Sequence, residues 1–193
     1  MEIDRWHIIG HDAGAAIAAH FAARFPHAVD RLVLASPPIY PEHQIPWFFR
    51  PLRAPVVGEL LAPLAAKLIF DVGLVQAIDE DADRSALIRS FQAPFLGKEG
   101  ARHLLHVLRW GDPTKVLATT ASLLPEITAP TLVLHGTRDQ AIPIDFAQRA
   151  AQDVTDGRCL LADATHFLPL NEPRWMAARI LPFLAGALRG CTE

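Results

Sequence analysis

The stretch WHIIGHDAG, residues 6–14, decides the fold of this 193-residue chain. Its first part, Trp6–Gly10, is a short apolar run ending in glycine, which indicates a buried β-strand. The alanine-rich segment Ala13–Phe25 follows at once and predicts a helix that packs closely on a sheet, with Pro26 ending it. Asp12 therefore stands at a sharp turn between a strand and a helix.

Glycines flank this turn, so Gly10-His11-Asp12-Ala13-Gly14 matches the pattern G-x-S-x-G with aspartate in place of serine. Small residues on both sides let the strand and the helix approach closely. The start of the helix would place the Ala13 N–H and a positive dipole end beside Asp12, where negative charge would develop. On this motif alone, Asp12 could equally be an ordinary helix N-cap.

Outside this motif, the pattern is that of an α/β protein. Strands are predicted at Arg31–Ala35, Thr131–Gly136 and Arg158–Leu161, and helices at Ile144–Gln152 and from Pro173 to about Leu188. Strands that alternate with helices predict a mostly parallel sheet of about four strands, covered by helices on both faces.

Prolines and apolar helical segments replace this alternation between residues 37 and 125, where no strand is evident. The candidate helices are Val56–Phe70, Asp81–Phe91, Gly100–Trp110 and Thr114–Leu123. We therefore expect a core made of residues 1–36 and 126–193, with residues 37–125 inserted as a helical cap over a site.

Two further residues favour a catalytic role for Asp12. Asp139 follows the strand that ends at Gly136, on the side of a parallel sheet where active sites form. His166 lies in the loop between the last strand and the last helix. Each would be an ordinary loop residue by itself, but together they give the order nucleophile, acid, histidine, 127 and then 27 residues apart.

With this order, the chain resembles the α/β-hydrolase superfamily from about Trp6 to Leu188, and its Gly-His-Asp turn is similar to that of haloalkane dehalogenases, fluoroacetate dehalogenases and epoxide hydrolases. The resemblance implies that Asp12 is the nucleophile, His166 the base and Asp139 the acid that orients it. It implies a hydrolase that forms a covalent aspartyl ester with a small apolar halide, epoxide or ester, and that needs no cofactor and no metal.

The chain departs from that family in beginning almost at the turn, whereas members carry strands and loops before it. Of the two expected oxyanion donors, the Ala13 N–H alone is present. The strand Trp6–Gly10 would have an uncovered apolar edge, which predicts pairing with a second copy of the chain. The alternative function is a hydrolase fold without catalysis, serving as an interaction module.

Residues that would contact the substrate are less clearly marked. His103, His106 and Trp110 share one face of a predicted cap helix, although they could also belong to an amphipathic helix lying on the core. Further candidates for substrate contact are His11, Tyr40, Trp47 and Phe167. Ala13 stands where haloalkane dehalogenases usually have tryptophan and fluoroacetate dehalogenases arginine, so the substrate is not specified.

Composition excludes several other functions. The formal net charge of −3, without a basic cluster, argues against nucleic acid and anionic membranes as partners. The acidic N-terminus does not resemble a signal peptide, and no apolar run reaches the ~18 residues of a membrane span. Cys159 and Cys191 are expected to be reduced thiols in the cytoplasm.

Metal chemistry is a further alternative for this motif. His11-Asp12 could be the dyad of an HD-type phosphohydrolase, but those folds are all-helical and a strand precedes this dyad. His7, His11 and His20 lack the spacing of a zinc site on one helix.

Overall fold

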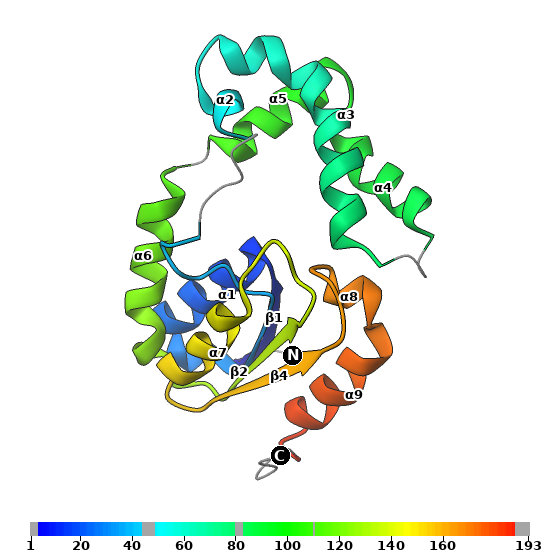
Figure 1. Cartoon of the computed structure of the whole chain (residues 1–193). Helices are drawn as coiled ribbons and strands as arrows, with labels where there is room; N and C mark the ends of the chain where they lie inside the picture. The colour runs from blue at the N-terminus through cyan, green and yellow to red at the C-terminus, as the bar shows by residue number, and fades with distance from the viewer. Residues whose placement is uncertain (1–3, 44–48, 80–82, 110, 188–193) are drawn as a thin grey trace.

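The computed structural model describes residues 4–43, 49–79, 83–109 and 111–187. Within them, four parallel strands form one sheet in the order β1-β2-β3-β4 (Figure 1). The strands are β1 (Trp6–His11), β2 (Val29–Ala35), β3 (Thr131–Gly136) and β4 (Gly157–Ala162). The predicted parallel sheet is confirmed. Because all strands run the same way, their carboxyl ends meet along one edge, toward the helical region.

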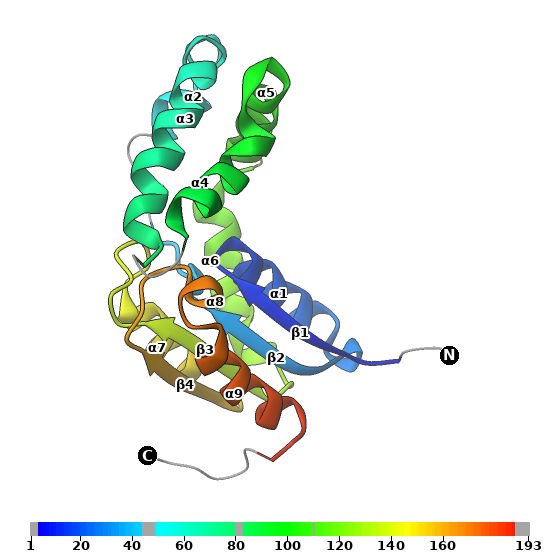
Figure 2. The ribbon, with the colours of Figure 1, turned by 90° about the vertical axis from the view of Figure 1, so that its right-hand side faces the viewer.

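Helices cover both faces of this sheet (Figure 2). On one face, α1 (Ala13–Arg24) and α7 (Ile144–Asp153) pack on the strands through alanines and Phe146. On the other face, α9 (Pro173–Leu184) packs on β3 through Met176, Ile180 and Phe183. The short helix α8 (Leu168–Asn171), which precedes α9, was not predicted from the sequence.

The other helices stand beyond the carboxyl ends of the strands (Figures 1 and 2). They are α2 (Arg50–Arg53), α3 (Val57–Ala77), α4 (Arg84–Gln92) and α5 (Gly97–Leu108). Helix α3 continues through Pro63 and extends beyond the predicted end at Phe70. Leu52, Leu104 and Leu105 form a separate hydrophobic cluster between α2, α3 and α5, so this region has its own small core.

Helix α6 (Pro113–Leu123) also falls in the range predicted as cap, but it packs on α1. Leu117 of α6 and Leu124 just after it belong to the same cluster as the alanines of α1. The chain therefore returns to the core layer before residue 126.

Two expectations about the environment of the protein can be compared with the described residues. None of the helices there is long and apolar enough to cross a membrane. Cys159 is a free thiol on β4, whereas Cys191 lies outside the described residues.

Candidate active site

Asp12 occupies the turn between β1 and α1 in a strained backbone conformation, with φ 52° and ψ −130°. A positive φ is unusual for a residue other than glycine, and such strain concentrates at functional sites. The turn is fixed by hydrogen bonds from the Asp12 N–H to the Ala35 carbonyl (3.0 Å) and from the Ala15 N–H to the Asp12 carbonyl (2.8 Å). The Asp12 carboxylate makes no capping hydrogen bond with α1, so it is available for other chemistry.

The two glycines of the turn have different roles. A Cβ atom at Gly10 would lie 2.4 Å from the Gly14 carbonyl oxygen and 2.7 Å from the Ala15 Cα, so only glycine fits there. A Cβ atom at Gly14 would meet nothing within 4 Å. The expectation that both glycines permit close packing of strand on helix is therefore correct for Gly10 and wrong for Gly14, which faces open space.

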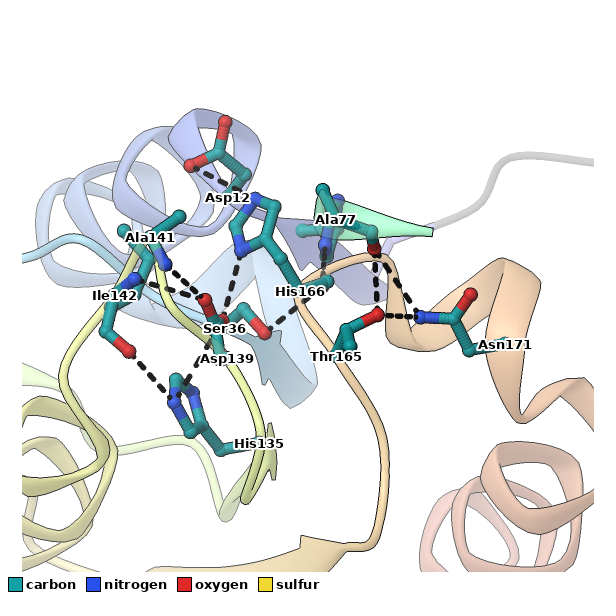
Figure 3. Close-up of polar contacts among 11 residues, drawn as sticks. Asp12, Ser36, Ala77, His135, Asp139, Ala141, Ile142, Thr165, His166 and Asn171 are labelled. Carbon is teal, nitrogen blue, oxygen red and sulfur yellow. Dashed lines mark hydrogen bonds and ion pairs between the residues drawn. The ribbon is translucent and has the colours of Figure 1, made fainter. Parts of the chain in front are cut away.

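The three predicted catalytic residues come together beyond the carboxyl ends of the strands (Figure 3). Asp139 follows β3, and its Oδ2 accepts a hydrogen bond from Nδ1 of His166 at 2.9 Å. His166 lies in the loop between β4 and α8, with its Nε2 3.9 Å from Oδ1 of Asp12. The histidine therefore binds the acid with one ring nitrogen and directs the other toward the turn.

Charge and burial act against each other at this pair. Burial alone lowers the pKa of His166, but the hydrogen bond and charge of Asp139, with the charge of Asp12, outweigh it and raise the pKa. Burial likewise raises the pKa of Asp139, but His166 and the N–H groups of Ile142 and Ala141 outweigh it and lower the pKa. Both shifts favour the ion pair.

The backbone of the histidine loop is held by the last residue of β1 and by the residue that follows β2. His11 Nε2 donates to the His166 carbonyl oxygen at 3.0 Å, and the Ser36 hydroxyl donates to the same oxygen at 3.3 Å. Ser36 is fully buried with φ 44°, another strained position. The sequence does not predict Ser36 as a site residue, because nothing local indicates its contact with a loop 130 residues away.

The helical region of α2 to α5, which is the predicted cap, is attached to the same loop through Ala77, the last residue of α3 (Figure 3). The Ala77 carbonyl accepts hydrogen bonds from the Phe167 N–H (3.1 Å), the Thr165 hydroxyl (2.8 Å) and the Asn171 side-chain amide (3.4 Å). The Asn171 amide also donates to the Thr165 hydroxyl at 2.6 Å. The end of α3 is thus fixed to the residues on both sides of His166.

A second attachment comes from the acid loop. Arg138, next to Asp139, forms ion pairs with Asp79 at 3.0 Å and Asp163 at 2.7 Å. Asp79 follows α3, so this arginine joins the end of that helix to the two loops that carry Asp139 and His166.

Of the predicted substrate contacts, Phe167 lies at the site. Its ring centroid is 5.3 Å from that of His166, 5.4 Å from that of His11 and 5.2 Å from that of Phe91 on α4. His11 is present as well, although its Nε2 is engaged by the His166 carbonyl. Burial lowers the pKa of His11. Ala13 begins α1, where a backbone N–H has no helical partner and can serve an oxyanion.

Tyr40 is a correction. It is fully buried in the core, its ring packs on Phe146, and its hydroxyl donates to Asp153 at 2.6 Å. The apolar ring is buried and the hydroxyl has a hydrogen-bond partner, so Tyr40 is a core residue and not a substrate contact. Burial, followed by this hydrogen bond, raises the pKa of Tyr40.

The cap histidines do not form part of the described site. His103 and His106 are exposed on α5, while Leu104 and Leu105 form its buried side. Because both side chains are exposed, they do not belong to the buried side of the helix, and their contact with a substrate stays a prediction. Trp47 and Trp110 lie outside the described residues.

Metal ligation is a separate question. Among the described residues, no group of three or more histidine, cysteine, aspartate or glutamate side chains is placed to hold a metal ion.

Comparison with known proteins fits this geometry. The profile of the family described as alpha/beta hydrolase fold matches residues 1–173. The chain belongs to the α/β-hydrolase fold family. A 2-hydroxy-6-oxo-2,4-heptadienoate hydrolase of Pseudomonas putida is 28% identical over 96% of the chain, and an uncharacterized protein of Mycobacterium tuberculosis is 22% identical over 89%. The chain spans 65% of the first relative's length and 53% of the second's.

Two solved structures are similar to this chain. An ancestral haloalkane dehalogenase is 25% identical with a TM-score of 0.77, covering 96% of this chain and 69% of its own. A 2-hydroxy-6-oxo-6-phenylhexa-2,4-dienoate hydrolase of Rhodococcus has a TM-score of 0.76 at 17% identity, covering 95% and 65%. This second likeness supports the fold alone.

Proposed function

We propose that this protein is a hydrolase in which Asp12 forms a covalent ester with a small apolar electrophile and His166 activates the water that cleaves it. The observation that carries the proposal is the arrangement around His166. Its Nδ1 is bound to Asp139 at 2.9 Å, while its Nε2 lies 3.9 Å from the Asp12 carboxylate, too far for a hydrogen bond.

This arrangement suits an aspartate nucleophile. A carboxylate needs no base to remove a proton before it attacks, so His166 is free for the second step. In the first step, an Asp12 oxygen attacks the electrophilic carbon, and a carbon–oxygen bond forms as the bond to the leaving group breaks. The leaving group, a halide or an oxygen, takes the bonding electron pair.

The second step releases the product. His166 Nε2 removes a proton from water, and the resulting hydroxide attacks the carbonyl carbon of the Asp12 ester. Asp139 stabilises the imidazolium that forms. Negative charge then develops on the ester oxygen, where the Ala13 N–H at the start of α1 is a suitable donor. Collapse of this intermediate releases the alcohol, which takes the proton, and regenerates the Asp12 carboxylate.

An apolar substrate is supported by the side chains near the triad. Phe167 from the histidine loop and Phe91 from the cap contact one another beside His166. The likeness to a haloalkane dehalogenase at 25% identity supports a halide, and an epoxide has the same kind of saturated electrophilic carbon. A carboxylic ester fits these steps less well, because attack of Asp12 on its carbonyl carbon would give an anhydride and not an aspartyl ester. We also propose a cytoplasmic location, which agrees with the free thiol of Cys159.

The experiment that tests this function is trapping of the ester. In His166→Gln, the first step proceeds but water is not activated, so intact-mass spectrometry should show an adduct after incubation with bromobutane or styrene oxide. Peptide mapping should place the adduct on Asp12. The matched control, the double variant Asp12→Asn with His166→Gln, should show none.

The second candidate is an interaction module without catalysis. It is favoured by the exposed apolar side chains of β1 and α1, among them Trp6, Ile9 and Ile17. If no probe yields an adduct on Asp12 while His166→Gln remains folded, this second function is preferred.

A further inference from the structure

A third histidine lies behind the catalytic acid and is not used in the proposed steps. His135 is on β3, near its carboxyl end, and is fully buried. Its Nε2 lies 3.1 Å from the Ile142 carbonyl oxygen and 3.8 Å from Oδ2 of Asp139 (Figure 3). Its Nδ1 is buried and has no hydrogen-bond partner within the described part of the chain.

These contacts define the protonation state of His135. A carbonyl oxygen only accepts hydrogen bonds, so Nε2 must carry the hydrogen and donate it to Ile142. In the neutral ring, Nδ1 is then a bare acceptor. Burial lowers the pKa of His135, against the opposing charge of Asp139, which agrees with a neutral ring.

A buried acceptor without a partner is energetically unfavourable. If this position only filled space, an aliphatic side chain would avoid that cost. The N–H on the other side of the ring therefore has to compensate for it, and this N–H points at the loop that carries Asp139.

The contacts of Ile142 explain how this N–H acts on the loop. The N–H of Ile142 donates to Oδ1 of Asp139 at 3.0 Å, beside the Ala141 N–H at 2.8 Å. The carbonyl of the same residue accepts from His135. The donors that orient the carboxylate are thus themselves held to β3 by the imidazole.

We propose that His135 is a positioning residue: by holding Ile142, it keeps the loop from Gly136 to Pro143 in the shape that aligns Asp139 with Nδ1 of His166. This role rests on the proposed function for its catalytic meaning, but its physical consequence does not require turnover. The alignment of Asp139 determines how strongly His166 holds its proton.

The test compares two variants by NMR titration of the His166 imidazole. His135→Leu removes the donor and keeps a similar bulk, whereas the amide of His135→Gln can still donate to Ile142. In His135→Leu, the pKa of His166 should fall by about one unit, a tenfold change in its acidity constant, because burial is then less opposed. In His135→Gln, it should stay close to the wild-type value.

Other charged groups act on these rings and must be assigned in the same titration. Asp12, Asp139 and His11 act on His166, and Asp139, His166 and Asp145 act on His135. His43 also interacts with His166.

Two results would overturn the proposal. An unchanged His166 pKa in His135→Leu would show that the imidazole does not position Asp139. Equal falls in both variants would show that ring shape, not the N–H donor, matters. If His135→Leu does not fold, the ¹⁵N chemical shifts of the wild-type His135 ring provide the test. Protonation of His135 Nδ1 between pH 6 and 8, at about the ordinary histidine pKa, would contradict the assignment of a neutral ring. Because no readout needs catalysis, an absent Asp12 adduct with a shifted His166 pKa would refute the proposed function alone.

Discussion

At the scale of single residues, the His166–Asp139 pair makes both stability and activity depend on pH. The raised pKa of His166 stabilises the fold fully below its ordinary value of 6.5, and this contribution is lost as pH rises through the folded-state pKa. The lowered pKa of Asp139 contributes above its ordinary value of 3.8 and is lost as pH falls through its folded-state pKa. The pair therefore stabilises the fold most between these two ordinary values.

Asp139→Asn should remove this effect. Urea unfolding should be measured at pH 5.5 and 8.5, on either side of the ordinary histidine pKa. The free energy of unfolding of the wild type should fall from the lower to the higher pH, and this fall should be smaller in the variant.

The rate of hydrolysis should depend on the same pair. Hydrolysis of the Asp12 ester needs neutral His166, so its rate should rise with pH, with a midpoint above 6.5 in the wild type. In Asp139→Asn, the rate should fall about a hundredfold or more, with a lower midpoint. An unchanged midpoint would contradict the pairing.

The two glycines of the turn provide a matched pair of variants. Gly10→Ala places a Cβ atom 2.4 Å from a backbone oxygen and should lower the free energy of unfolding by about 1–3 kcal/mol. Gly14→Ala meets nothing within 4 Å and should change stability by less than about 1 kcal/mol. Chemical denaturation measures both values, and equal effects would show that the close approach at Gly10 is not as described.

At the scale of elements, the end of α3 and the histidine loop should move together. Asn171→Ala removes the hydrogen bonds to Thr165 and from the Asp79 N–H, and should cost about 1–2 kcal/mol. Hydrogen exchange should increase at residues 77–79 and 165–168. Arg102→Ala breaks an exposed ion pair on α5 and serves as the control, with no such increase. Equal exchange in both variants would mean that the cap is held elsewhere.

Elements and triad differ in how far the sequence predicts them. The strands follow from apolar runs. Thr131–Gly136 is observed with its predicted bounds, because burial on both faces of this strand produces a local pattern. The strand at Trp6–Gly10 is also present, but the prediction that it is buried is wrong, since Trp6 and Ile9 are exposed at the edge of the described sheet. Asp12, Asp139 and His166 could be selected because each follows a strand in a fixed order. Ser36 and Asn171 could not, since their roles depend on contacts between segments far apart in the chain. His135 could not either, because its contact with Ile142, seven residues later, depends on how the loop after β3 folds back.

The positions of Tyr40 and α6 differ from the sequence prediction for the same reason. Tyr40 is a candidate by residue type alone, which does not reveal the side toward which its segment packs. α6 continues the helical pattern of the cap, and only its contact with α1 places it on the core.

At the scale of the whole molecule, β1 is an edge strand of the described sheet, and α1 lies beside it (Figure 2). Apolar side chains of both elements are exposed. Ile9 is 52% exposed and Ile17 59% exposed. An uncovered apolar edge favours association, so we expect the chain to self-associate through this face. Light scattering after gel filtration should show a lower mass for Ile17→Glu, but not for Leu181→Glu on α9, which is equally exposed. A monomeric wild type would contradict this.

The central claim, that Asp12 is the nucleophile, is tested most directly by one turnover of the wild-type protein in ¹⁸O water with the probe that gives the Asp12 adduct. Water that attacks the ester carbonyl leaves its oxygen on Asp12, whereas the product alcohol receives an unlabelled oxygen from the enzyme. Mass spectrometry should therefore find the label in the Asp12 peptide and none in the product. Label in the product, with an unlabelled Asp12 peptide, would show that water attacks the substrate directly and would contradict the account.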